Sequence, residues 1–193
     1  KRLLLIAYSV PLCMLIRLIK PLIFIRLGTL YAYKIGPFGS QTELYLCEKD
    51  HGLQPTNTLD IFISDPTSFI CNRQLYTMWK RLLYVNDIFL PLYMMMMRLP
   101  FGNEHIIRTT NDSRDVHGLL ERTEGHLVFT DEEVGRAKIE LSRMGITGND
   151  TYVLMLNRGQ RYLNEMFSER DWSYHEWRNV SISDLMLAAK KLT

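Results

Sequence analysis

Residues 171–179, DWSYHEWRN, bring aromatic, acidic, basic and amide side chains together in one short stretch. Aromatic rings can stack on the apolar faces of a sugar, while carboxylate, amide and guanidinium groups bind its hydroxyls. Asp171, Tyr174 and Arg178 are therefore candidate substrate-binding residues, and His175 is a candidate general base. The alternative is a well-packed loop in which the same aromatic residues serve only packing.

The glycine-bearing stretch IGPFGSQTE, residues 35–43, is a second candidate site. It matches neither the GxGxxG spacing of a dinucleotide loop nor the GxxxxGK[ST] spacing of a phosphate loop, so a simple turn is the commoner outcome. The stretch follows an apolar segment that is typical of a buried strand. The alternative is therefore a ligand loop at the carboxyl end of that strand.

Arg158 follows another apolar segment, TYVLMLN at residues 151–157. An arginine at the carboxyl end of a strand can bind a diphosphate, because its planar fork of donors matches two oxygens. The alternative is an ordinary surface arginine.

Several absences narrow the function classes. The chain has no HExxH or GxSxG motif, no histidine pair at helical spacing and no Asp-x-Asp after a predicted strand, so no metal site is predicted. Its cysteines, Cys13, Cys47 and Cys71, form no CxxC pair and fit buried thiols in a reducing compartment. A net charge of +2 without a long basic run argues against nucleic acid as a partner.

The elements that would position these residues alternate between strands and helices. Short apolar runs predict strands at 22–28, 59–65, 126–130 and 151–157. Helices are predicted between them, which favours an α/β fold with a mainly parallel, Rossmann-like sheet flanked by helices. At 193 residues the chain has room for one domain and the start of another.

Helix boundaries are marked by capping residues. Thr42 is a candidate N-cap for residues 43–50, and Asn72 for a helix that carries Trp79 on its apolar face. Thr130 and Glu133 form a capping box, and Gly145 ends the helix that follows. Val134, Ala137, Leu141 and Met144 form the expected buried stripe of that helix, and a last helix is expected from Ser183.

Residues 3–25 are the most apolar part of the chain. Charges interrupt the run before it reaches the length of about 20 residues that a spanning helix needs. An interfacial helix at residues 1–21 is predicted, with Arg17, Lys20 and Arg26 placed to meet anionic headgroups. The alternative is a buried core helix.

Four blocks together resemble the amino-terminal half of a bacterial glycosyltransferase-like family. They are residues 16–50, NRQLYTMWKR at 72–81, HLVFTDEE at 126–133 and DWSYHEWRNVSISDLMLAA at 171–189. The resemblance covers nearly the whole chain from Ile16. It implies a GT-B architecture of two Rossmann-like domains, distantly similar to fucosyltransferases and heptosyltransferases.

The resemblance implies an acceptor-side domain at 22–148 and the truncated start of a donor-side domain at 149–193. Arg158 would stabilise the leaving nucleotide diphosphate of a nucleotide-sugar donor, without a metal or other cofactor. Glu43 would be a candidate base beside His175. The acceptor, a glycan or a lipid-linked sugar, would be oriented by the loop residues Gly36, Phe38, Gly39, Gln41 and Thr42.

Three residues depart from the family pattern. Pro37 stands where the family has histidine, and Asn157-Arg158-Gly159 stands where it has valine, arginine and aspartate. The resemblance implies a metal-independent glycosyltransferase, at the cytoplasmic face of the inner membrane or in the cytoplasm. The alternative is a catalytically inactive, membrane-associated module that binds a glycan or a partner.

Overall fold

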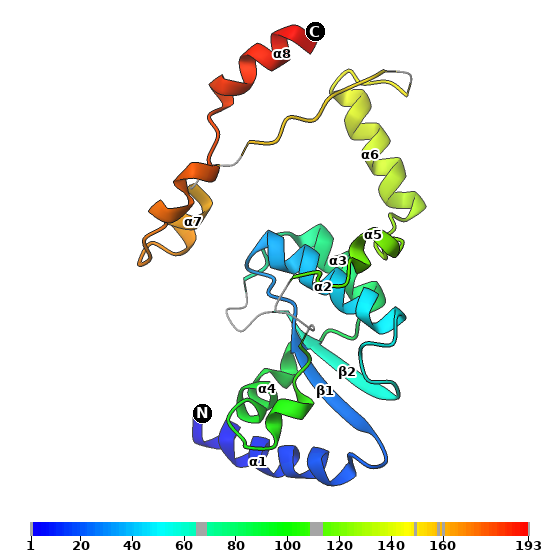
Figure 1. The fold of residues 1–193 in the computed structure, drawn as a ribbon, viewed down its shortest axis with the longest axis vertical. Helices are drawn as coiled ribbons and strands as arrows, with labels where there is room; N and C mark the ends of the chain where they lie inside the picture. The colour runs from blue at the N-terminus through cyan, green and yellow to red at the C-terminus, as the bar shows by residue number, and fades with distance from the viewer. Residues whose placement is uncertain are drawn as a thin grey trace. The chain divides into compact units, whose positions relative to one another are not determined.

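The computed structural model describes residues 2–64, 69–108, 114–148, 150–157, 159 and 161–192. The chain divides into two units, Lys1–Thr130 and Asp131–Thr193. Figure 1 shows their elements. The predicted domain boundary at residue 148 lies inside the second unit.

Two strands form the centre of the first unit, where two of the apolar runs predict them. β1 (Phe24–Thr29) and β2 (Thr58–Ile63) pair in parallel, with Phe24 opposite Thr58 and Thr29 opposite Ile63. Parallel strands with helices on both faces are buried on both sides, which explains why both sequences read as nearly continuous apolar runs.

Two further segments extend the parallel arrangement by single bridges. Ile106 bridges to Leu27 of β1, and Val85 bridges to Phe62 of β2, both in parallel. Backbone hydrogen bonds of 2.8 Å accompany them, from the amide of Ile107 to Leu27 and from that of Phe62 to Tyr84. The spatial order is therefore the Val85 segment, β2, β1 and the Ile106 segment, or third, second, first and fourth along the chain.

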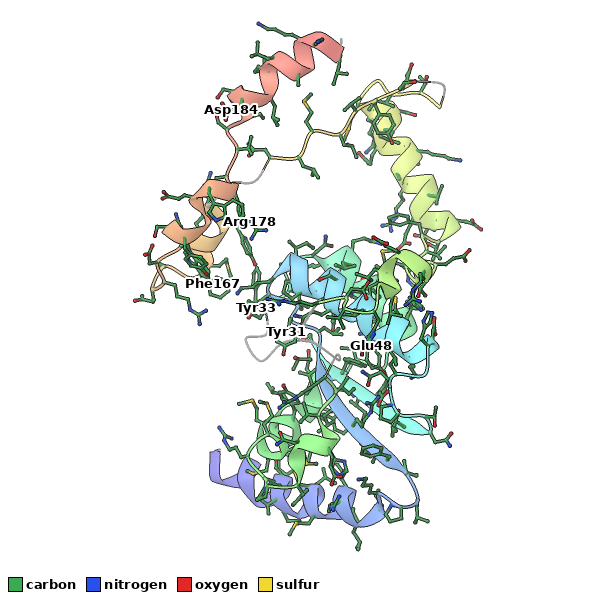
Figure 2. The ribbon with its side chains drawn as sticks, viewed as in Figure 1. Tyr31, Tyr33, Glu48, Phe167, Arg178 and Asp184 are labelled. Carbon is green, nitrogen blue, oxygen red and sulfur yellow. The ribbon has the colours of Figure 1, made fainter. Side chains whose placement is uncertain are left out.

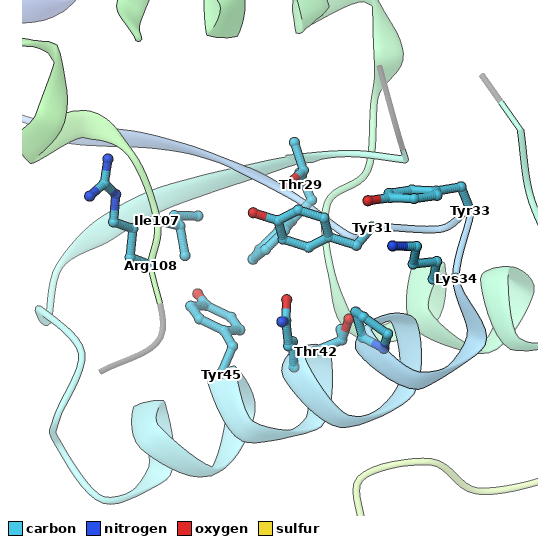
Figure 3. A pocket seen from close by; sticks show the side chains of 11 residues that line it. Thr29, Tyr31, Tyr33, Lys34, Thr42, Tyr45, Ile107 and Arg108 are labelled. Atoms are coloured by element: carbon cyan, nitrogen blue, oxygen red, sulfur yellow. The ribbon is translucent and has the colours of Figure 1, made fainter. Parts of the chain in front are cut away.

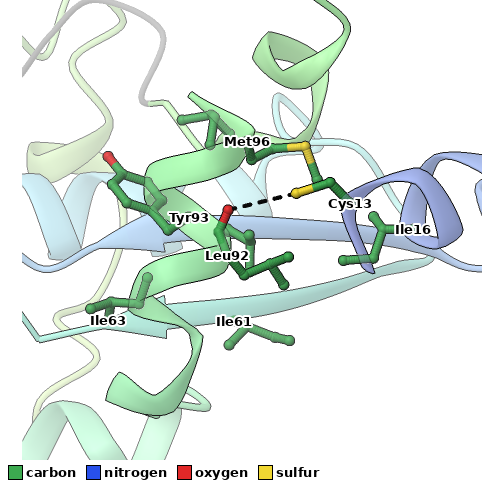
Figure 4. Packing of buried hydrophobic residues seen from close by; sticks show 9 residues of the cluster. Cys13, Ile16, Ile61, Ile63, Leu92, Tyr93 and Met96 are labelled. Atoms are coloured by element: carbon green, nitrogen blue, oxygen red, sulfur yellow. Dashed lines mark hydrogen bonds between the residues drawn. The ribbon is translucent and has the colours of Figure 1, made fainter. Parts of the chain in front are cut away.

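One face of the sheet is covered by α1 (Arg2–Ile19) and α4 (Leu90–Met96). Cys13 and Ile16 of α1 are buried there, and the Cys13 thiol donates to the carbonyl oxygen of Leu92 at 3.9 Å (Figure 4). This buried cluster consists of Cys13, Ile16, Leu27, Ile61, Ile63, Leu92, Tyr93, Met96 and Ile106.

The other face is covered by α2 (Ile35–Asp50) and α3 (Arg73–Leu82). Phe62 points to this face, while its neighbours Ile61 and Ile63 point to the first, as the pleat of a strand requires. Trp79 is fully buried and donates from Nε1 to the Phe38 carbonyl oxygen at 3.0 Å. The cluster consists of Leu30, Ala32, Phe38, Tyr45, Leu46, Phe62, Trp79, Leu83 and Val85.

The predicted loop at 35–43 is wrong, because these residues form the first two turns of α2. Thr42 lies inside that helix rather than at its cap. Pro37 is tolerated because the first four amides of a helix have no intrahelical partner. Gly36 and Gly39 have open space around them, since a Cβ at either would meet nothing within 4 Å.

The N-terminal segment forms a helix that is buried on one side, as the core-helix alternative predicts. Its other side exposes apolar residues, including Met14, Leu15 and Leu18. None of the helices in the described residues is both long enough and apolar enough to cross a bilayer. The prediction that Arg26 meets headgroups is wrong, because its side chain is 4% exposed and paired with Asp60.

Several helix boundaries of the first unit follow their sequence signals. The Asn72 side chain accepts from the amide of Leu75 at 2.9 Å and caps α3 as predicted. Pro91 lies in the first turn of α4. The short elements η1 (Asp87–Phe89), η2 (Gly102–His105) and α5 (Leu119–Arg122) complete this unit.

Helices are the only regular elements among the described residues of the second unit. They are α6 (Asp131–Arg143), α7 (Arg161–Met166), η3 (Ser173–Arg178), η4 (Ile182–Leu185) and α8 (Met186–Leu192). Gly145, at φ +82°, ends α6 as predicted. The last helical segment begins at Ile182, one residue before the predicted start at Ser183, and is capped by Ser181.

Three predictions about buried segments are wrong. Residues 126–130 and 151–157 form no strand. No described segment pairs with these residues to form a sheet. Their side chains are therefore not covered, and Leu154 and Leu156 are 81% and 91% exposed. The expected stripe of α6 is not buried either: of its four residues only Leu141 is half-buried.

Candidate functional site

A pocket of about 310 Å³ opens at the carboxyl end of β1, between this strand and α2 (Figure 3). The Ile106 segment borders it through the two residues that follow the bridge. The lining residues are Thr29, Tyr31, Tyr33, Lys34, Pro37, Gln41, Thr42, Tyr45, Phe62, Ile107 and Arg108.

The segment after β1 supplies alternate side chains to the pocket. Its backbone continues to bond the chain after β2, since the amides of Leu30 and Ala32 donate to the carbonyls of Ile63 and Ser64 at 3.0 and 3.2 Å. Leu30 and Ala32 are therefore buried in the core, while Tyr31 and Tyr33 project into the pocket.

Tyr31 has a left-handed backbone, with φ +50°. This conformation is uncommon for a residue with a bulky side chain and costs of order 1–3 kcal/mol, which the surrounding structure must offset. Beside it, the Lys34 ammonium lies 5.2 Å from the centre of the Tyr33 ring. In Figure 3, Lys34 and Arg108 lie at opposite ends of the pocket with Tyr31 between them.

α2 presents one side of its first turns to the pocket. Gln41 and Thr42, both predicted to bind substrate, lie on this side together with Pro37 and Tyr45. Phe38 does not, because its side chain is fully buried in the core under Trp79. Gly36 and Gly39 lie in the helix and do not line the pocket.

A buried polar network supports the floor of the pocket. The Arg26 guanidinium donates to both carboxylate oxygens of Asp60 at 2.8 Å and to the Gln54 side chain at 2.7 Å. Gln54 in turn donates to the Arg108 carbonyl at 3.0 Å and to Glu48, on α2, at 2.6 Å. The network therefore joins both strands, α2 and the segment that carries Arg108.

The network fixes Tyr45, which lines the pocket, through a hydrogen bond from its hydroxyl to Asp60. Burial and this bond raise the pKa of Tyr45, so its hydroxyl stays protonated. Burial alone would raise the pKa of Asp60, but hydrogen bonds from Arg26 and Tyr45 outweigh it and lower that pKa. The carboxylate is thus held charged beneath a neutral phenol.

Glu43, a predicted base, points away from the pocket. Its Oε1 accepts from the backbone amide of His126 at 3.0 Å and lies 2.9 Å from His126 Nδ1. His126 Nε2 lies 2.9 Å from Asp50 Oδ2. Burial alone would lower the pKa of His126, but bonds to these two carboxylates raise it.

The remaining predicted residues belong to the second unit. Asp171 accepts from the amide and hydroxyl of Ser173, the first residue of η3, both at 2.9 Å. Tyr174 is exposed, and the Arg178 guanidinium lies 5.7 Å from the centre of the Trp177 ring (Figure 2). Arg158 and the side chain of His175 lie outside the described part of the chain.

Most of the residues that line the pocket were not predicted from the sequence. Tyr31, Tyr33 and Lys34 follow β1 in the run TLYAYK, whose alternation of polar and apolar residues beyond a strand was the available signal. No local signal marks Arg108, which reaches the pocket only because Ile106 pairs with β1.

Comparison of the chain with models of protein families, with curated proteins and with solved structures found no match.

Proposed function

We propose that the first unit is the acceptor-side domain of a glycosyltransferase and that its pocket binds a sugar carrying a phosphate or another anionic group. The observation that supports this most is the position of the pocket. In doubly wound α/β folds, ligands bind beyond the carboxyl ends of the strands, where the strand order reverses. Here β1 lies between β2 and the Ile106 segment, and the pocket is at that point.

The order of the four segments supports the Rossmann-like assignment. Third, second, first, fourth is the beginning of the 3-2-1-4-5-6 strand order of a doubly wound sheet. Helices on both faces of parallel segments agree with the same architecture.

The lining chemistry supports a charged sugar as the ligand. Tyr31 and Tyr33 offer aromatic faces, Gln41 and Thr42 offer donors and acceptors, and Lys34 and Arg108 offer positive charge. Lysine and arginine are the side chains that bind phosphate most strongly. A phosphate-bearing or lipid-linked acceptor fits these residues better than a neutral glycan does.

Transfer itself would depend on a second, donor-side domain. Among the described lining residues of the pocket there is neither a carboxylate nor a histidine, so the base would come from elsewhere. The resemblance assigns leaving-group stabilisation to Arg158, with His175 as the remaining base candidate and no metal in the reaction. Asp171, Tyr174 and Arg178 would bind substrate on that side.

The outer side of α1 supports contact with a membrane surface. Leu18 is 76% exposed, and Met14 and Leu15 are about half exposed. Arg17 and Lys20 lie at the carboxyl-terminal end of α1, and both form ion pairs with Glu104. Such a helix would lie in the interface rather than cross it, at the cytoplasmic face where a lipid-linked acceptor is presented.

Ligand titration of the full chain tests the pocket. Sugar phosphates and nucleotide sugars are added to labelled protein and followed by NMR or calorimetry. Arg108→Ala and Lys34→Ala should each weaken binding about 10- to 100-fold, because a hydrogen bond to a charged group contributes about 1.5–3 kcal/mol. Lys138→Ala, on α6 of the second unit, is the matched control. Binding that both pocket variants leave unchanged would refute the proposal.

The second candidate function is a binding module without catalysis. The absence of a carboxylate or histidine among the described lining residues favours it, as do Pro37 and Gly159. Sugar transfer from a nucleotide sugar to a phosphorylated acceptor by the full-length protein would exclude this alternative. Ligand binding without transfer would support it.

A further inference from the structure

A second cluster of reactive side chains lies on α2, on the side that faces away from the pocket. Glu43, Cys47 and His126 place one carboxylate oxygen, one thiol and one ring nitrogen within 4.8 Å of one another. The Cys47 side chain is 1% exposed, and those of Glu43 and His126 are 19% and 18% exposed. The first two residues are one helical turn apart, so they share a face of α2.

We propose that Glu43, Cys47 and His126 bind a zinc ion. Thiolate, imidazole and carboxylate are the protein ligands that zinc takes, and three of them with one open position make a common tetrahedral site. The thiolate and imidazole favour zinc over magnesium or calcium, which prefer oxygen ligands alone.

Asp50 supplies an independent argument. A histidine that binds a metal through one ring nitrogen usually donates the other N–H to a carboxylate, which fixes the tautomer. His126 Nε2 lies 2.9 Å from Asp50 Oδ2, while Nδ1 lies 2.9 Å from Glu43 Oε1. With the Nε2 proton held by Asp50, zinc at Nδ1 would displace the proton that this nitrogen shares with Glu43.

A hydrogen bond also orients the Glu43 carboxylate. Its Oε1 accepts from the backbone amide of His126 at 3.0 Å, so this amide holds the carboxylate beside the ring. The ligand atoms must close up to reach bond lengths of about 2.0–2.3 Å to zinc. α2 and the 123–126 segment would thereby be joined by coordination in addition to hydrogen bonds.

Binding should release protons. Zinc needs the thiolate of Cys47 and an unprotonated Nδ1 of His126. The apparent affinity should therefore increase with pH.

Cobalt(II) spectroscopy of the full chain tests the site. Chelator-treated protein is titrated with Co²⁺, and the expected result is one equivalent bound, with a thiolate-to-cobalt charge-transfer band and the strong visible bands of a tetrahedral site. Zn²⁺ should then displace the cobalt. Absence of these bands in the parent protein would overturn the proposal.

Variants assign the ligands. Cys47→Ser should abolish the charge-transfer band, whereas Cys71→Ser, the matched control, should retain it. Asp50→Asn changes a side chain that is 54% exposed and should weaken binding about 10- to 100-fold while the protein stays folded. A band that persists in Cys47→Ser, or an affinity that Asp50→Asn leaves unchanged, would contradict the site. Ligand binding in the pocket is a separate measurement, so either proposal can fail alone.

Discussion

Both units of the chain contain apolar segments, but the two units bury them very differently. In the first unit, two clusters of buried side chains cover the two faces of β1 and β2. In the second unit, Trp172 is the one buried apolar residue among those described, at 5% exposure. Its indole donates to the Phe167 carbonyl at 3.1 Å and contacts the rings of Phe167 and Tyr174.

This difference shows that an apolar segment becomes core only when partners distant in sequence meet it. LDIFISD and TYVLMLN are comparable as sequences. β2 has β1 and Val85 beside it and a helix layer over each face, so its residues are buried. Residues 151–157 have no such neighbours among the described residues, and they remain exposed.

The largest difference between the two units should appear when one tryptophan in each is truncated to alanine. Trp79→Ala removes a fully buried ring and its hydrogen bond to Phe38, so it should lower the free energy of unfolding by about 3–5 kcal/mol. Trp172→Ala should change the main urea transition by less than about 0.5 kcal/mol, because its contacts are local. Urea titration followed by circular dichroism measures both. Equal losses would remove the contrast between the units.

A smaller effect should follow from breaking the buried ion pair of the first unit. Asp60→Asn leaves Arg26 charged and without its carboxylate, which should cost about 3 kcal/mol at neutral pH. Glu132→Gln, at an exposed position of α6, is the control from the second unit.

The same variant has a defined pH dependence. The pKa of Asp60 is lower in the folded state than in the unfolded state, where it is near 3.8. Its stabilisation is therefore present above pH 4 and is lost as the pH falls through the folded-state pKa. Acid unfolding should accordingly be shallower in Asp60→Asn than in the parent. Parallel curves for the two proteins would show that the pair does not act in this way.

The smallest effect should come from removing helix caps. Asn72→Ala frees the Leu75 amide and should cost about 1 kcal/mol in the main transition. Ser181→Ala removes the corresponding cap in the second unit, where it should reduce helicity without moving that transition. Amide hydrogen exchange at residues 75 and 183–184 distinguishes local fraying from global destabilisation. A shift of the main transition by Ser181→Ala would show that the two units unfold together.

The sequence by itself determined those features whose causes are local. The β-branched apolar runs predicted β1 and β2, Asn72 predicted the start of α3, and Gly145 predicted the end of α6. Each of these signals acts through backbone preferences or through hydrogen bonds within a few residues. The predicted break at Gly36 and Pro37 was wrong for a local reason as well, because the first turn of a helix tolerates both residues.

Only the tertiary structure decided which segments pair and which side chains meet. Pairing of Ile106 with β1 brings Arg108 to the pocket, and the return of residues 123–126 to α2 brings His126 to Glu43 and Cys47. The helical conformation of α2 also turns Glu43 away from the pocket that Gln41 and Thr42 line, although the sequence predicted all three residues in one loop. The physical reason is that strand pairing and side-chain clusters are formed by residues far apart in the chain, and no local pattern encodes the partner.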